Sequence, residues 1–194
     1  MSVGILDIAR STTRIPPLEN GDILASSEFL RRYRNAPGHI KAELIDGVVF
    51  MASPVSVFHG NPHTDIIGWL YNYRIATPGT DTADNSTIRL DVRNVPQPDV
   101  AFYTLADHGG SVEISQDGYI EGSPELVAEI STTSTSLDLG PKKTCYARNG
   151  IQEYIVWRTF DEELDWFSLK DGAYERLSPS MDGVIRSRVF PGLW

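Results

Sequence analysis

The chain has 194 residues, enough to bury one hydrophobic core, and its 26 acidic and 17 basic side chains give a formal net charge of −9. That charge argues against a protein that simply coats nucleic acid, because neutralising phosphates takes clustered Lys and Arg, but it does not exclude an enzyme that touches DNA locally. The single cysteine, Cys145, excludes an internal disulfide and a cysteine-rich zinc site.

Neither membrane insertion nor export is expected from the sequence. No apolar run approaches the roughly 20 residues that a membrane span needs. Residues 1–14 lack the basic start and apolar core of a signal peptide. We therefore expect a cytoplasmic protein with no membrane contact.

The chain is expected to form one domain preceded by a short N-terminal segment. Residues 1–24, with Pro16-Pro17, are expected to form an extended N-terminal segment. Residues 25–194 contain no repeat, low-complexity tract or flexible linker, so they are expected to form a single domain.

The first half of this domain begins with a helix and a hairpin. Ser26 is a suitable N-cap for a short helix that ends near Arg34. Residues 42–52 alternate as a β-hairpin around an Asp46-Gly47 turn. Asn61 then precedes a second helix, with Pro62 at its first helical position, and this helix stops at Pro78-Gly79.

The second half is richer in strands. Residues 106–123 are loop-rich with a small hairpin, and a short helix runs from Pro141 to Asn149 with Gly150 after its end. Strands are predicted at 87–92, 99–103, 125–130, 152–157, 164–169 and 173–177, of which the last two pair as an antiparallel C-terminal hairpin. This order predicts an α/β fold with a central mixed sheet flanked by helices, whose middle strands include 99–103, 126–130 and 154–157.

Two carboxylates stand at the ends of predicted core strands. Asp99 follows Pro98 at a strand start, and Glu129 lies in the apolar run Val127–Ile130, where an acidic residue is costly to bury without a partner. Such a pair can share Mg²⁺, which takes oxygen ligands. Lys142 falls in the first turn of the next predicted helix, where a cation is unfavourable unless it points at a negative site. Taken singly, such an Asp is more often a cap, and such a Glu is more often an ion-pair partner.

Two histidines precede or begin the second helix. His59 and His63 are four residues apart, which on one helix face would suit a transition metal. Because Pro62 lies between them, one regular helix through both is not expected. We retain His59 as an accessory site residue and leave His63 out.

The ordered set of motifs resembles the bacterial putative restriction endonuclease domain family of uncharacterised function, within the PD-(D/E)XK nuclease superfamily. The resemblance covers roughly residues 25–194. The matching pieces are Glu43-Leu44-Ile45-Asp46-Gly47, Met51-Ala52-Ser53-Pro54 with a downstream histidine, Pro98-Asp99-Val100, residues 124–131, Lys142, Tyr146, residues 150–154 and Phe190-Pro191-Gly192-Leu193.

The resemblance implies a restriction-endonuclease-like fold and a set of site residues. Asp99 and Glu129 would hold Mg²⁺, or Mn²⁺ in its place. Lys142 would help to activate the attacking water, and Glu43 would complete the site. In the simplest superfamily motif the lysine stands two residues after the glutamate, where this chain has Ser131. Lys142 fits a variant in which the lysine comes from the next helix, with Lys143 as the neighbouring alternative.

These observations predict a metal-dependent DNA endonuclease that hydrolyses phosphodiester bonds. The alternative is a catalytically silent or partner-dependent binding module that keeps the fold, which the acidic balance and the lack of a recognisable DNA-reading element favour. A metal-dependent hydrolase of another substrate is a third reading. Because many such nucleases need two active sites to cut both strands, we expect a homodimer.

Overall fold

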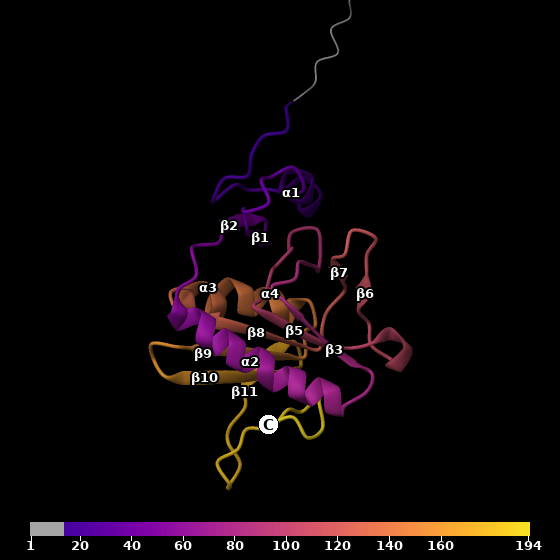
Figure 1. Cartoon of the computed structure of the whole chain (residues 1–194), viewed down its shortest axis with the longest axis vertical. Helices are drawn as coiled ribbons and strands as arrows, with labels where there is room; N and C mark the ends of the chain where they lie inside the picture. Colours follow the sequence, from indigo (N-terminus) through magenta and orange to yellow (C-terminus); the bar gives the residue numbers. More distant parts are fainter. Residues whose placement is uncertain (1–13) are drawn as a thin grey trace, which may run out of the picture.

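The computed structural model describes residues 14–194 of the chain (Figure 1). In chain order its helices and strands are α1 (Ser26–Tyr33), β1 (Ala42–Ile45), β2 (Val48–Met51), α2 (Val57–Ala76), β3 (Thr80–Asp84), β4 (Ile88–Arg89), β5 (Val100–Thr104), a 3₁₀ turn (Ala106–His108), β6 (Glu113–Ile114), β7 (Ile120–Glu121), β8 (Leu126–Ser131), α3 (Thr135–Leu137), a π-helical turn (Asp138–Lys142), α4 (Lys143–Arg148), β9 (Glu153–Arg158), β10 (Glu163–Lys170) and β11 (Ala173–Arg176).

The core of the protein is a mixed six-stranded sheet with the strand order β11-β10-β9-β8-β5-β3. Only β8 and β9 pair in parallel, and the helical segment 135–148 makes the crossover between them. The other neighbours in this sheet are antiparallel. The predicted mixed sheet is therefore confirmed, with β5, β8 and β9 at its centre and the β10–β11 hairpin at one edge.

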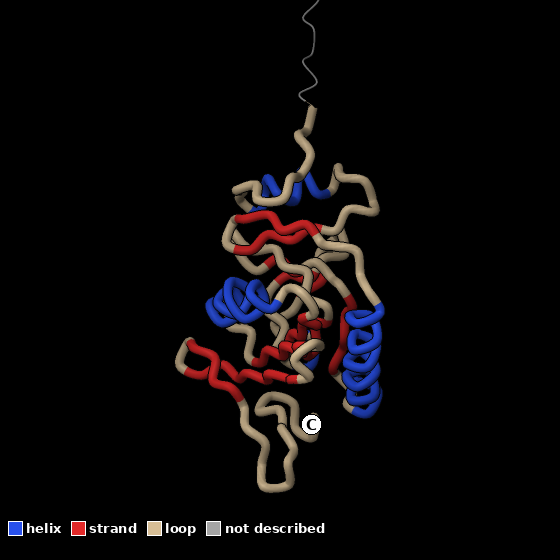
Figure 2. The backbone as a smooth tube through the Cα atoms, turned by 90° about the vertical axis from the view of Figure 1, so that its left-hand side faces the viewer, coloured by secondary structure: helices blue, strands red, loops and turns tan. Residues whose placement is uncertain are grey.

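Helices cover both faces of this sheet, with α2 on one side and α3 and α4 on the other (Figures 1 and 2). Side chains alternate between the faces along each strand. The α2 side is an apolar cluster that also takes in the C-terminal segment and includes Ile66, Leu70, Phe102, Ala128 and Leu193. The α4 side is a second cluster, which includes Ala101, Val127, Cys145, Tyr146 and Tyr154.

The β1–β2 hairpin and α1 form a cap beyond one end of the sheet (Figure 1). Phe29 of α1 and Leu44 and Val49 of the hairpin are buried together in a third apolar cluster. Asp46 and Gly47 both have positive φ (52° and 80°), as a tight two-residue hairpin turn requires, so the predicted turn is confirmed.

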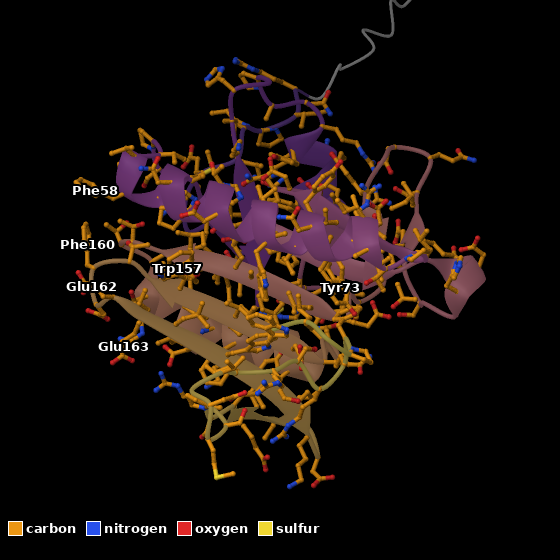
Figure 3. The ribbon with its side chains drawn as sticks, turned by 60° about the horizontal axis from the view of Figure 1, so that its bottom comes forward. Phe58, Tyr73, Trp157, Phe160, Glu162 and Glu163 are labelled. Carbon is orange, nitrogen blue, oxygen red and sulfur yellow. The ribbon has the colours of Figure 1, made fainter. Side chains whose placement is uncertain are left out.

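Helix α2 differs from the prediction at its start. It begins at Val57, not at Pro62, and Pro62 lies inside it. Phe58 lies beside Phe160, in the turn between β9 and β10, with ring centroids 6.0 Å apart (Figure 3), and both side chains are largely exposed. A proline so near a helix start leaves one early carbonyl without its donor, a loss that the tertiary packing of the helix overrides.

The helical segment after β8 also begins earlier than predicted. It starts at Thr135, and Pro141 lies within the π-helical turn 138–142 instead of at the first helical position. Proline has no N–H to donate to a regular helix, and a π turn is a common local adjustment near functional sites. Lys142 is therefore not in the first turn, and the argument from the helix dipole does not hold.

Two strands and one helix cap differ from the prediction. Strand β3 was not predicted, because its sequence Thr80–Asp84 is polar, as suits an edge strand paired only with β5. The predicted strand 87–92 shortens to β4, which belongs to a separate three-stranded sheet with β7 and β6. In α1 the N-cap is Ala25, and its first turn has no side-chain cap.

The N-terminal segment is described only in part. Residues 1–13 of the predicted extended segment lie outside the described residues. Beyond them, residues 14–22 form no helix or strand, yet Leu18 is buried beneath α1 and Gly21 N donates to Val49 O at 2.8 Å. Among residues 14–194, no helix has both the length and the apolar character needed to cross a bilayer.

Candidate active site

A cleft of about 750 Å³ opens at the end of the sheet that faces the β1–β2 hairpin. The hairpin, the start of α2, the end of β8 and the segment 132–142 enclose it. The ionisable residues at its wall are Lys41, Glu43, His59, His63, Asp99, Glu129, Asp138 and Lys142.

Lys142 lies among three carboxylates in this cleft. Its Nζ lies 2.9 Å from Oε1 of Glu43 and 3.0 Å from Oε1 of Glu129. Asp138, one helical turn earlier in the chain, is 3.9 Å away. These three carboxylates outweigh the cost of burying the ammonium group and raise the pKa of Lys142, so the side chain remains a cation.

Glu129 is held in the most buried strand of the sheet. All six residues of β8 are buried, and Glu129 itself is 4% exposed. Its Oε1 accepts hydrogen bonds from Lys142 Nζ and, at 2.8 Å, from the Tyr146 hydroxyl. Burial raises the pKa of Glu129 well above its usual value, although Lys142 acts in the opposite direction.

Asp99 lies next to Glu129 across two antiparallel strands. Val100 of β5 is the partner of Ala128 in β8, so the register continued by one residue places Asp99 opposite Glu129. Its Oδ2 accepts a hydrogen bond from Ile130 N at 2.6 Å, and its Oδ1 lies 3.2 Å from His59 Nε2. Burial alone would raise the pKa of Asp99, but His59 and the Ile130 amide bring it below its usual value.

The four site residues expected from the sequence therefore converge on one cleft. Asp99 and Glu129 come from neighbouring strands, Lys142 from the crossover helix and Glu43 from the capping hairpin. His59 also faces this group, since it contacts Asp99. Lys143 points elsewhere: its Nζ lies 3.7 Å from the centre of the Phe167 ring.

Two residues of the cleft wall, Asp138 and His63, and the buried Tyr146 that bonds to Glu129 were not assigned to the site from the sequence. Asp138 is buried and accepts a hydrogen bond from Ser134 Oγ at 2.5 Å; its signal is an acidic residue four positions before the lysine. Tyr146 was noted only as part of a motif. His63 was left out because of Pro62, yet it shares a face of α2 with His59, and the two ring centroids lie 5.5 Å apart.

The donor set of the cleft suits a bound divalent cation. Glu43, Asp99, Glu129 and Asp138 are four largely buried carboxyl groups, against one buried lysine and His59. Such an excess of oxygen donors in a desolvated site is the chemistry that Mg²⁺ or Mn²⁺ requires. Asp99 and Glu129, adjacent across β5 and β8, could hold such an ion.

Comparison with known protein families identifies this architecture. The sequence model described as "Uma2: Putative restriction endonuclease" matches residues 26–194. The chain belongs to this family. None of the curated proteins compared with the chain matches it.

A solved structure supports the same fold. The crystal structure of a putative nuclease belonging to DUF820 from Anabaena variabilis ATCC 29413 superposes with a TM-score of 0.64 at 11% sequence identity. The match covers 83% of this chain and 89% of that chain. Family and fold are thus those expected of a restriction-endonuclease-like nuclease.

Proposed function

We propose that this Uma2 family member is a divalent-metal-dependent endonuclease that hydrolyses phosphodiester bonds in DNA. The observation that carries the proposal is the convergence of Asp99, Glu129 and Lys142 in one cleft, since these are the residue types that such hydrolysis needs. Each comes from a different element, and nothing in their sequence spacing alone would require them to meet.

Asp99 and Glu129 are the proposed metal ligands. When bound, Mg²⁺ or Mn²⁺ would polarise the phosphoryl oxygen and lower the pKa of the attacking water. Burial, together with the neighbouring carboxylates of Asp138, Asp99 and Glu43, raises the pKa of Glu129 despite Lys142. A bound cation would favour the ionised form of this group.

Lys142 is the proposed fixed cation of the reaction. Glu43, Glu129 and Asp138 hold its ammonium group in place, so no reorganisation is needed when negative charge builds up on the phosphate. Lys142 also lies where it can orient the attacking water. The new bond joins the water oxygen to phosphorus and the bond from phosphorus to the sugar oxygen breaks. The proton that the water loses balances the proton that the leaving sugar oxygen takes up, so the products are a phosphate monoester and an alcohol.

Glu43 and His59 are proposed to support these residues. Glu43 bonds to Lys142 through Oε1, while its Oε2 accepts a hydrogen bond from Gln97 N at 3.2 Å. His59 orients Asp99 through the contact to Oδ1. Both therefore fix the direction of a group that faces the substrate.

We further propose that the enzyme acts in the cytoplasm as a homodimer. One cleft per chain can serve one strand at a time, so a symmetric pair of chains would let both strands be cut. Light scattering on the purified protein tests this: the dimer mass is expected, and a monomer mass at working concentration contradicts it.

Cleavage of supercoiled and linear duplex DNA in the presence of Mg²⁺ or Mn²⁺ tests the proposed activity. The wild-type chain should nick or linearise the plasmid, and Asp99→Asn should not. Lys143→Ala is the matched control and should remain active. If the wild-type chain cleaves neither DNA with either metal, the proposed DNA cleavage is wrong, and the binding module and the hydrolase of another substrate are the readings that remain.

A further inference from the structure

Two histidines lie side by side on the face of α2 that borders the cleft. His59 and His63 are one helical turn apart, and their rings meet edge to face at 5.5 Å between centroids. Both side chains are mostly buried, with 20% and 13% exposed. Pro62 lies between them without breaking the helix.

The hydrogen bonds of these rings fix where each nitrogen lone pair lies. His59 Nδ1 is 3.0 Å from the carbonyl oxygen of Ile130, which only accepts, so this nitrogen carries the hydrogen. His63 Nε2 is 3.0 Å from the Asp99 carbonyl oxygen and 3.1 Å from Oδ1 of Asp84, so the same reasoning places its hydrogen there. In the neutral state, His59 Nε2 and His63 Nδ1 are left with the lone pairs.

This is the arrangement found at histidines that bind metal ions. A ligating histidine almost always donates its other ring N–H to a carbonyl or a carboxylate, which fixes the tautomer. Here His59 does so to Ile130 and His63 to Asp99 and Asp84. His59 Nε2 faces Oδ1 of Asp99 at 3.2 Å, a contact that a proton on Nε2 makes in the absence of a metal and that a metal ion bound to both atoms would replace.

The distances fit one ion bound by three residues. Neighbouring ligands about 2.1 Å from a common metal lie about 3.0–3.4 Å apart, which matches the 3.2 Å between His59 Nε2 and Asp99 Oδ1. One ligand atom from each of His59, His63 and Asp99 lies within 4.8 Å of the others. Two ligands of one such ion stand at most about 4.2 Å apart, so a group within this limit is close to the size that one ion requires.

We propose that His59, His63 and Asp99 form a binding site for a divalent transition-metal ion of the Co²⁺ and Zn²⁺ class. This site uses His59 and His63 in place of Glu129 and shares Asp99 with the proposed nuclease pair. Two imidazoles with one carboxylate favour the later first-row ions, whereas Mg²⁺ prefers a site made of oxygen alone. The inference does not depend on whether the chain cleaves DNA.

Visible absorption of Co²⁺ in the untagged full-length chain is the test. Co²⁺ added to the wild-type chain should develop ligand-field bands, equimolar Zn²⁺ should remove them, and millimolar Mg²⁺ should not. His63→Asn, which keeps a donor toward the Asp99 carbonyl, should weaken Co²⁺ binding at least about tenfold, within the range for altered metal sites.

Two control variants separate this site from its alternatives. His39→Ala and His108→Ala each remove an exposed histidine and should leave the titration unchanged. An absence of bands in the wild-type chain, or equal affinity in His63→Asn, overturns the inference. DNA cleavage with Mg²⁺ is measured separately, so a chain that binds Co²⁺ but cleaves no DNA contradicts only the proposed function.

Discussion

Lys142 Nζ lies 3.0 Å from Oε1 of Glu129, although 13 residues separate the two in the chain. The contact forms because the segment after β8 turns back as helix over the strand it has just left. Its π-helical turn ends at Lys142, and the same turn brings Oδ1 of Asp138 to 3.9 Å from the ammonium group. The single crossover connection between β8 and β9 therefore supplies both Lys142 and one of its carboxylate partners, Asp138.

Removal of this cation should separate catalysis from metal binding. We expect Lys142→Ala to lose about a hundredfold in cleavage rate, or about 3 kcal/mol of transition-state stabilisation. Because the lysine competes with a metal ion for the same carboxylates, Mg²⁺ or Mn²⁺ should bind the variant at least as well as the wild-type chain. Single-turnover kinetics and the metal-dependent shift in melting temperature measure the two effects.

The controls for this prediction are Lys142→Met and Lys143→Ala. Lys142→Met keeps the buried aliphatic stem, so it guards against a loss that reflects unfolding alone. Lys143 lies over the Phe167 ring, away from the cleft, so its loss should leave the rate unchanged. An inactive Lys143→Ala beside an active Lys142→Ala would show that the wrong lysine has been assigned.

Glu153 should matter for stability and not for chemistry. It is fully buried at the start of β9, where it accepts hydrogen bonds from Trp166 Nε1 (3.2 Å), Ser187 Oγ (2.8 Å) and Arg188 N (2.6 Å). These contacts tie the C-terminal segment to the sheet. Glu153→Gln places an N–H group against donors, so we expect the free energy of unfolding to fall by about 1–3 kcal/mol.

Urea denaturation followed by fluorescence measures this loss. Glu113→Gln, in the exposed strand β6, is the matched control and should change the free energy of unfolding by no more than about 0.5 kcal/mol. If Glu153→Gln leaves the free energy of unfolding unchanged, the buried carboxyl group does not hold the C-terminal segment.

The thiol of Cys145 should be unreactive toward thiol reagents in the folded protein. Burial raises the pKa of its thiol to about 12, and the side chain is 0% exposed. Only the thiolate reacts, so an aromatic disulfide reagent at pH 8 should modify the native chain very slowly and the unfolded chain at once. Rapid modification without denaturant would contradict the packing of α4 against the sheet.

Much of the fold follows from local sequence signals. The β1–β2 hairpin was predicted because Asp46-Gly47 suits a two-residue turn, and β8 because residues 126–130 are apolar enough for a strand buried on both faces. The edge strand β3 gave no such signal, because a polar strand is stabilised by its single neighbour β5 and not by its own pattern.

Two site residues were missed because prolines misled the prediction of helix starts. Pro62 and Pro141 each suggested a helix start, and both lie inside helical segments that tertiary contacts hold together. The first error removed His63 from the site. Because of the second, Asp138 was not assigned to the site: it falls between the predicted strand and helix but lies one turn before Lys142 in the structure.

The cleavage rate of Glu129→Gln as a function of Mg²⁺ concentration tests the central claim most directly. Glu129→Gln keeps the shape and the acceptor for Lys142 and Tyr146 but removes the charge proposed to hold the metal. On one supercoiled plasmid, the account predicts Mg²⁺-dependent cleavage by the wild-type chain and by Lys143→Ala, and a loss of at least about a hundredfold in Glu129→Gln. Cleavage by Glu129→Gln at the wild-type rate and the wild-type Mg²⁺ dependence would contradict it.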